Sequence, residues 1–344
     1  MSRYALLILA ATNRVYAESS IALTQAELAL FSERVLADKV GRIEAATLGG
    51  VPYVTFEADT LDTREIALVS NLSSVHALFE READLLRPLA VRKLDRFDDD
   101  LITIQKYSGK TNEQFTKLLL NVTLLATSFA SELLDRRFGV LDPLCGRGTT
   151  LNQAMMYGFN AAGVEIDRKD FEAYSTFVET WLKRKRIKHR LHSGPVRRDK
   201  RLLGRRFEAS FAATKDDYKS GATQRLDVVN ADTSRAEDFF AQASFDVIVT
   251  DAPYGVQHGS STSGKGLARS PIDLLGTAVP VWSRLLRSGG AIGISWNTKV
   301  ARRNDVTAVL VAAGLEPFVA GPYLRFEHRV DQAIVRDVIV ARKG

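Results

Sequence analysis

The second half of the chain alternates short apolar runs with helical patterns. Strand-like runs lie at 140–141, 161–165, 228–230, 245–250 and 291–295, and helices are expected to begin at Thr149 and Arg168. Parallel strands need a crossover connection, most often a helix, so this rhythm predicts an α/β fold with a mostly parallel, doubly wound, Rossmann-like sheet and helices on both faces. Ligands bind such sheets at the carboxyl ends of the strands.

A smaller α+β module is predicted before residue 112. Strand-like runs lie at 4–11, 51–57 and 101–106. A helical pattern covers 24–37, where Thr24 and Glu27 have the spacing of a capping box. We therefore expect two domains, residues 1–111 and 112–344.

Two further predictions concern the ends of the second domain. Apolar residues recur at helical spacing over 113–137, which predicts one long connecting helix. Near the end of the chain, residues 325–329 and 333–341 have the pattern of two more strands.

The composition excludes several classes of protein. The 344 residues are 45% hydrophobic and 26% charged, which is typical of a soluble globular protein. The single cysteine, Cys145, excludes an intramolecular disulfide, and no Cys/His cluster has zinc-site spacing, so we expect no metal and a cytoplasmic location. No apolar run approaches the roughly 20 residues of a membrane span, so we expect no membrane partner.

Positive charge is concentrated in one segment. The chain has a net charge of +6, but residues 183–206 hold twelve Lys or Arg and one Asp, a net charge of +11, which leaves −5 for the remainder. A cationic insertion in an otherwise acidic chain suits a polyphosphate backbone, although a solvated loop without function would have the same composition. The candidate nucleic-acid-binding residues are Lys183, Arg184, Lys185, Arg186, Arg197, Arg198, Lys200 and Arg201.

A glycine turn follows the first strand of the alternating region. The sequence Asp-Pro-Leu-Cys-Gly-Arg-Gly-Thr-Thr occupies residues 142–150, and Gly146 and Gly148 allow the backbone to approach a ligand. A dinucleotide fingerprint would have a third glycine where Leu151 stands, and the Gly-Lys-Ser/Thr of a P-loop is absent. Asp142 would repel a pyrophosphate but attract a cationic amino group. The turn therefore predicts a site for S-adenosyl-L-methionine, with Asp142 on its α-amino group.

The next two strands also end in acids. Glu165, which we prefer to Asp167, is placed to accept hydrogen bonds from both ribose hydroxyls, and Asp232 to accept one from the adenine amino group. Each acid alone is more often a turn former or helix cap, but three at successive strand ends favour a binding site. Cys145 is expected to be a small packing residue. The candidate cofactor-binding residues are Asp142, Cys145, Gly146, Gly148, Thr149, Glu165 and Asp232.

The fourth strand ends in a catalytic motif. Asp251, Ala252, Pro253 and Tyr254 resemble the Asp/Asn-Pro-Pro-Tyr motif of amino-methyltransferases, with Ala252 in place of the first proline. In that motif the first side chain and the next carbonyl accept the hydrogens of a flipped amino group, while the aromatic ring stacks on the base. A plain β-turn is the alternative.

Taken together, the two motifs are similar to those of the THUMP-associated tRNA guanine-N2 methyltransferases, the eleventh-type tRNA methyltransferases and their bacterial relatives. The resemblance covers residues 138–297 and 326–342, whereas before residue 112 it rests on length and α+β character. It implies a class I S-adenosylmethionine-dependent methyltransferase sheet preceded by a smaller THUMP-like domain that engages tRNA. The alternatives are a DNA adenine or cytosine amino-methyltransferase and a nucleic-acid-binding protein that keeps the fold without catalysis.

Three polar segments near these motifs have open interpretations. Thr111, Asn112 and Gln114 could cover the methionine end of the cofactor or form an ordinary helix entrance. His258 could shuttle a proton, although an incidental loop histidine is the simpler interpretation. The glycine- and serine-rich residues 259–266 fit either a lid over the base pocket or a surface loop.

Overall fold

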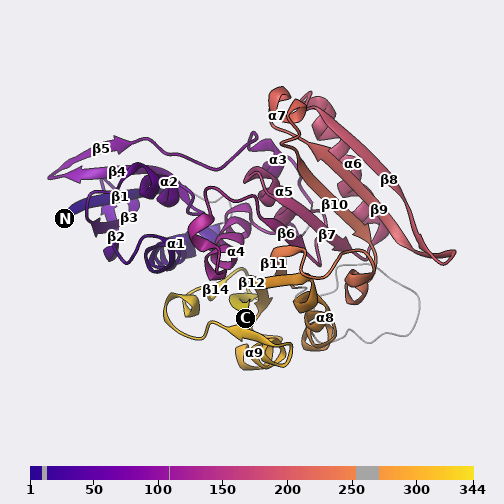
Figure 1. The fold of residues 1–344 in the computed structure, drawn as a ribbon. Coiled ribbons are helices and arrows are strands. Elements are labelled where there is room, and N and C mark those ends of the chain that lie inside the picture. Colours follow the sequence, from indigo (N-terminus) through magenta and orange to yellow (C-terminus); the bar gives the residue numbers. More distant parts are fainter. Residues whose placement is uncertain (10–13, 108, 253–270) are drawn as a thin grey trace.

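The computed structural model describes residues 1–9, 14–107, 109–252 and 271–344 (Figure 1). The first ninety residues form a five-stranded antiparallel sheet with two helices. Its strands are β1 (Ser2–Ile8), β2 (Gly41–Leu48), β3 (Val51–Ala58), β4 (Val75–Glu82) and β5 (Leu85–Leu89), in the order β2-β3-β1-β4-β5. Its helices are α1 (Arg14–Val35) and α2 (Thr63–Val69). The predicted first strand is therefore central and largely buried.

Two predictions for this region were wrong. Helix α1 begins at Arg14, so Thr24 lies inside it and its hydroxyl donates to the Ser20 carbonyl at 2.7 Å instead of capping a helix. The capping box stands at α2, where Asp62 and Glu65 exchange hydrogen bonds. Residues 101–106 form no strand, because α3 (Asp100–Thr103) is a short helix.

The larger sheet has helices on both faces, as predicted, but it is mixed and not mostly parallel, because the strands on both sides of its parallel core pair antiparallel. Its order is β13-β15-β12-β11-β6-β7-β10-β9-β8, with β14 paired to β15. The parallel core consists of β6 (Gly139–Asp142), β7 (Asn160–Glu165), β10 (Gln224–Asn230), β11 (Phe245–Asp251) and β12 (Leu286–Asn297). One face packs against α4 (Glu113–Ala126), α5 (Thr149–Met156) and α6 (Arg168–Arg184). The other face packs against η2 (Thr233–Asp238), α8 (Pro271–Leu285) and α9 (Arg303–Ala312). Among the described residues, no helix is both long and apolar enough to cross a bilayer.

The connecting helix is shorter than predicted. Helix α4 ends at Ala126 because Thr127 adopts an extended conformation, and the Ser128 amide then donates to the Gly289 carbonyl at 2.8 Å. A 3-10 turn, η1 (Ala130–Glu132), follows. At the end of the chain, β15 (Val335–Lys343) matches a predicted strand, but β14 (His328–Arg329) has only two residues after η3 (Gly321–Leu324). The sequence pattern also missed the short edge strand β13 (Leu315–Pro317).

The basic segment folds as an extension of this sheet. Strands β8 (His189–Arg198) and β9 (Arg201–Phe211) form a long antiparallel hairpin, and β9 pairs with β10. Phe207, Ala209 and Phe211 are buried and belong to the core cluster that includes α6. The insertion is therefore an ordered ribbon at the sheet edge, followed by α7 (Lys215–Lys219), and not a coil.

Buried polar contacts join the two sheets through α4. Glu27 of α1 accepts hydrogen bonds from the Ser73 amide and hydroxyl and, at 2.7 Å, from the Asn121 amide nitrogen of α4. Asn121 in turn accepts from the Tyr157 hydroxyl at 2.9 Å. A single hydrophobic cluster runs through the same region, with members from β1 and α1 as well as from α4, α5 and α6. The two sheets therefore share one core.

Candidate active site

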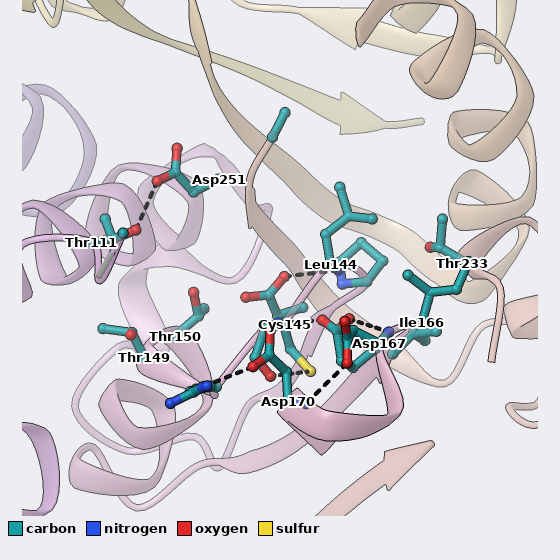
Figure 2. Close-up of a pocket in the computed structure, with 18 of the residues that line it drawn as sticks. Thr111, Leu144, Cys145, Thr149, Thr150, Ile166, Asp167, Asp170, Thr233 and Asp251 are labelled. Atoms are coloured by element: carbon teal, nitrogen blue, oxygen red, sulfur yellow. Dashed lines mark hydrogen bonds and ion pairs between the residues drawn. The ribbon is translucent and has the colours of Figure 1, made fainter. Parts of the chain in front are cut away.

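A cavity of about 840 Å³ lies at the carboxyl ends of the parallel strands. This volume is within the range of small-molecule and cofactor sites, roughly 300–1,000 Å³. All four acids predicted at successive strand ends line it, namely Asp142, Glu165, Asp232 and Asp251. Figure 2 shows Thr111 and Asp251 on one side of the cavity and Cys145 and Asp167 on the other. The topology thus brings together residues that are far apart in sequence.

Asp142 is buried at the end of β6. Only 4% of its surface is exposed, and its Oδ1 accepts from the Leu144 amide at 3.1 Å. Burial raises the pKa of this carboxyl from 3.8 to about 6, although the hydrogen bond from the Leu144 amide opposes the rise. Within the described residues, no cation forms an ion pair with it. A buried acid of this kind is suited to a ligand that brings its own positive charge.

Glu165 organises the glycine turn from the end of β7. Its two carboxylate oxygens accept from the Gly146 amide at 2.8 Å and from the Asp167 amide at 2.6 Å. Burial raises the pKa of Glu165 to about 7. Asp167 caps α6 by accepting from the Lys169 and Asp170 amides. Of these two acids, it is therefore Glu165 that holds the cavity wall in place.

The two glycines of the turn have different roles. Gly146 lines the cavity, and a Cβ there would meet nothing within 4 Å. Gly148 does not line the cavity: it has a φ of 79°, and a Cβ would fall 2.2 Å from the Tyr174 ring. The expectation that both glycines clear space for a ligand is therefore wrong for Gly148, which is needed where α5 begins against α6.

The remaining predicted cofactor residues also reach the cavity. Thr149 lines it, and its hydroxyl is hydrogen-bonded to the Tyr107 hydroxyl at 3.0 Å. Cys145 lines it as well, and burial raises the pKa of its thiol well above the usual range, in keeping with a packing residue. Asp232 caps η2 through the Ser234 amide and hydroxyl, so it both lines the cavity and fixes its rim.

Asp251 is held from three directions at the end of β11. Its Oδ1 accepts from the Ser295 hydroxyl at 2.6 Å, and its Oδ2 accepts from the Thr111 hydroxyl at 2.9 Å. Arg336 of β15 donates to Oδ2 at 3.2 Å, and its guanidinium lies 4.3 Å from the centre of the Phe115 ring. Arg336 is 4% exposed. The carboxylate is thus fixed in position by three donors, of which Ser295 and Arg336 are buried.

The sequence pattern missed two of these donors. Ser295 ends a predicted strand, so the rule that found the acids could have found it. Arg336 and Asp337 stand among the apolar residues of the predicted strand 333–341, and a charged residue inside a buried strand is the signal for a buried partner.

Of the other polar residues singled out in the sequence, some line the cavity and others do not. Thr111 reaches the cavity, but Asn112 caps α4 through the Phe115 amide and Gln114 donates to the Leu9 carbonyl, so these two act as an ordinary helix entrance. Ala252 lines the cavity and its amide donates to the Ser295 carbonyl at 2.8 Å. Pro253, Tyr254, His258 and residues 259–266 lie outside the described residues.

The basic residues do not form one group. Helix α6 runs antiparallel to β7, from the carboxyl ends of the parallel strands, where the cavity lies, toward their amino ends. The residues at and just after its end therefore lie at the amino ends of these strands, namely Lys183, Arg184, Lys185 and Arg186. There Lys183 pairs with Glu179, and Lys185 with Asp98 and Asp100. In contrast, Arg197, Arg198, Lys200 and Arg201 lie at the hairpin tip, on the cavity side.

Residues 133–286 match the model of the UPF0020 family, described as an RMKL-like methyltransferase domain. The matched span contains Asp142, Glu165, Asp232 and Asp251. The larger sheet therefore has a Rossmann-like methyltransferase fold, and its cofactor is S-adenosyl-L-methionine. No curated protein matches the chain in sequence.

Several solved structures resemble the chain at low identity. They include TrmN from Thermus thermophilus, at 14% identity over 100% of both chains with a TM-score of 0.45. A putative rRNA-methylase from Clostridium thermocellum has 11% identity over 61% of this chain and 90% of its own, with a TM-score of 0.36. Magnesium protoporphyrin IX methyltransferase from Synechocystis PCC 6803, with bound SAM, has 9% identity over 72% of this chain and 89% of its own, with a TM-score of 0.39.

Proposed function

We propose that this protein transfers a methyl group from S-adenosyl-L-methionine to an exocyclic amino group of a base in RNA, with guanine N2 of tRNA as the target. One observation carries the proposal. The Asp251 carboxylate, fixed by Thr111, Ser295 and Arg336, lines the same cavity as the buried acid Asp142.

The residues around the glycine turn fit the cofactor. Asp142 offers a buried carboxylate for the α-amino group, and Glu165 and Asp232 offer acceptors for the ribose hydroxyls and the adenine amino group. When bound, S-adenosyl-L-methionine supplies an electrophilic methyl group on a sulfonium centre. In addition, a cationic ligand offsets the cost of ionising Asp142, because an opposite charge nearby favours the charged form of an acid.

The other side of the cavity fits an amino group. An amine conjugated to a base ring is a weak nucleophile, so it must be oriented with its lone pair toward the methyl group. Asp251 can accept one of its hydrogens, and the carbonyl of Ala252 is the second acceptor implied by the motif. Because Asp251 is already fixed by its donors, little reorganisation is needed when charge develops on the nitrogen. Tyr254 would supply the stacking surface.

RNA is favoured over DNA by the motif resemblance to tRNA guanine-N2 methyltransferases. In this proposal residues 112–344 form the catalytic domain, and residues 1–111 form the domain that engages tRNA. The exposed cations of the hairpin tip lie on the cavity side of the sheet, where a polyanionic substrate would approach.

The test is methyl transfer from labelled cofactor to unmodified tRNA transcripts, followed by mass spectrometry of the nucleosides. We expect N2-methylguanosine with the wild-type protein, formed roughly a hundredfold more slowly by Asp251→Ala. Label on duplex DNA but not on tRNA would support the DNA amino-methyltransferase instead. Calorimetric cofactor binding without transfer to total cellular RNA or DNA would show a fold that has lost catalysis.

A further inference from the structure

The β8–β9 hairpin extends past the carboxyl ends of the parallel strands, where the cavity lies. Arg205 of β9 pairs with Asn230, the last residue of β10, and the next two residues along the chain, Ala231 and Asp232, line the cavity. The hairpin residues from Arg197 to Gly204 therefore lie beyond the end of β10. Figure 1 shows this tip projecting from the body of the sheet.

The other end of the hairpin lies near the amino ends of the parallel strands, away from the cavity. Arg190 pairs with Ser210, and Ser210 pairs with Arg225, near the start of β10. Because α6 runs antiparallel to β7, Arg184, Arg186 and Lys188 also lie toward those ends. The sheet thus separates the basic segment into two groups, one on the cavity side and one on the opposite side.

Both groups have the same number of available charges. Four cations of the segment are engaged in ion pairs, namely Lys183 with Glu179, Lys185 with Asp98 and Asp100, Arg198 with Asp238, and Arg206 with Asp227. Among the described residues, the other eight form no ion pair, and all eight are exposed. The tip group is Arg197, Lys200, Arg201 and Arg205, and the far group is Arg184, Arg186, Lys188 and Arg190.

The tip ends in a tight turn and is tied to a neighbouring element by an ion pair. Asp199 and Lys200 have φ values of 49° and 65°, and Arg198 pairs with Arg201 across them, which is the geometry of a two-residue hairpin turn. Glycine adopts such a conformation without penalty, whereas lysine does not. The turn itself therefore gains nothing from the lysine at residue 200. The ion pair of Arg198 with Asp238, at 2.9 Å, anchors the tip to η2. Leu202 is 60% exposed beside these cations.

We infer that the tip group binds phosphates of the RNA substrate next to the nucleotide whose base enters the cavity. This inference rests on the proposed function. A polyphosphate chain suits the tip because several cations projecting from one ribbon can neutralise successive phosphates, and binding of this kind is salt-dependent. The far group has the same charge but faces away from the cavity, so it should contribute little.

Two matched variants of the full chain test the inference. One replaces the tip group by glutamine (R197Q, K200Q, R201Q, R205Q), and the other replaces the far group (R184Q, R186Q, K188Q, R190Q). Each removes four positive charges. Binding of an unmodified tRNA transcript is measured by fluorescence anisotropy over a range of salt concentrations, cofactor affinity by calorimetry, and folding by thermal melting.

We expect the tip variant to bind tRNA at least tenfold more weakly at low salt. The slope of log K against log salt concentration should be smaller by about three, since each lost phosphate contact reduces it by about 0.7–0.9. The far variant should change the slope by less than about one. Both should melt like the wild type and keep its cofactor affinity. Equal losses in the two variants would overturn the inference in favour of a general charge effect, as would wild-type binding by the tip variant.

Turnover separates this inference from the proposed function. If the inference holds, the tip variant raises KM for tRNA and leaves kcat nearly unchanged, because its residues lie outside the cavity. Absence of methyl transfer by the wild type would refute the proposed function, while the anisotropy result would still decide on RNA binding by the tip. Tighter binding of a duplex DNA than of tRNA, with the same dependence on the tip, would overturn RNA as the ligand.

Discussion

Replacing Asp142 by asparagine is expected to stabilise the cofactor-free protein while weakening cofactor binding. Burial raises the pKa of this carboxyl from 3.8 to about 6, which corresponds to about 3 kcal/mol against the ionised form. The pKa of Asp142 is higher in the folded than in the unfolded protein. The wild type is therefore most stable at a pH below the unfolded-state pKa, and it loses that stability as the pH rises through the folded-state pKa. Asparagine carries no charge to bury.

The expected gain follows from these pKa values. At pH 8 Asp142→Asn should raise the free energy of unfolding by about 1–3 kcal/mol, the lower figure allowing for an amide nitrogen without an acceptor. At pH 5 the gain should be smaller by about 1.4 kcal/mol, because the wild-type carboxyl is then mostly protonated in the folded state. Cofactor affinity should drop roughly ten- to a hundredfold, because a hydrogen bond to a charged group is lost.

A second buried aspartate provides the control. Asp246 lies at the opposite end of the neighbouring strand β11, 1% exposed, and is paired with Arg136 at 2.7 Å and Arg287 at 2.9 Å. Asp246→Asn should therefore destabilise the protein by about 3–5 kcal/mol and leave cofactor affinity unchanged. Urea denaturation at pH 8 and pH 5 and isothermal calorimetry measure both variants. If Asp142→Asn is less stable than the wild type at pH 8, or binds S-adenosyl-L-methionine normally, the assignment of the buried carboxylate to a cationic ligand group is wrong.

Further substitutions test the rest of the site. Asp251→Ala should lower turnover on tRNA roughly a hundredfold with cofactor affinity kept, and wild-type turnover would refute the amino-methyltransferase mechanism. Arg336→Met should lower kcat about tenfold, with Arg336→Lys retaining more activity, if the ion pair positions Asp251; equal kcat in all three proteins would exclude that role. Gly148→Ala should cost roughly 2 kcal/mol or more in urea denaturation, because its Cβ would overlap the Tyr174 ring. Tyr254→Ala should weaken tRNA binding by about 1–3 kcal/mol and Tyr254→Phe should not, as measured by anisotropy.

The acids of the cavity could be predicted because their signal is local. Asp142, Glu165 and Asp251 each end an apolar strand, and parallel strands converge at one edge of a sheet, so a pattern of a few residues was enough to place them together. Arg336 could not be placed in this way. It stands 85 residues from Asp251, and only the position of β15 beside β12 brings the two together.

Tertiary contacts account for the failed predictions in the first domain. Glu27 has the spacing of a capping residue relative to Thr24, but its carboxylate bonds to Ser73 and Asn121, which come from other elements. Helix α1 packs against residues of both sheets, so the polar residues of its first turns gave no amphipathic pattern from which its start could be found. The hairpin was hidden for a different reason: the less exposed positions of the edge strand β8 are His189, Leu191, Gly194 and Val196, so apolar residues do not recur there with a period of two.

The shared core and the Glu27–Asn121 contact have a consequence for substrate selection. Because one packed interior joins the two sheets, a large movement of the first sheet relative to the methyl-transfer cavity would have to break that packing. An RNA that touches both must therefore present its target nucleotide at a matching distance from the bound region. The length of RNA between the two contact points would then decide which transcripts are methylated. A transcript lengthened or shortened by a few base pairs between these points would be bound without being methylated.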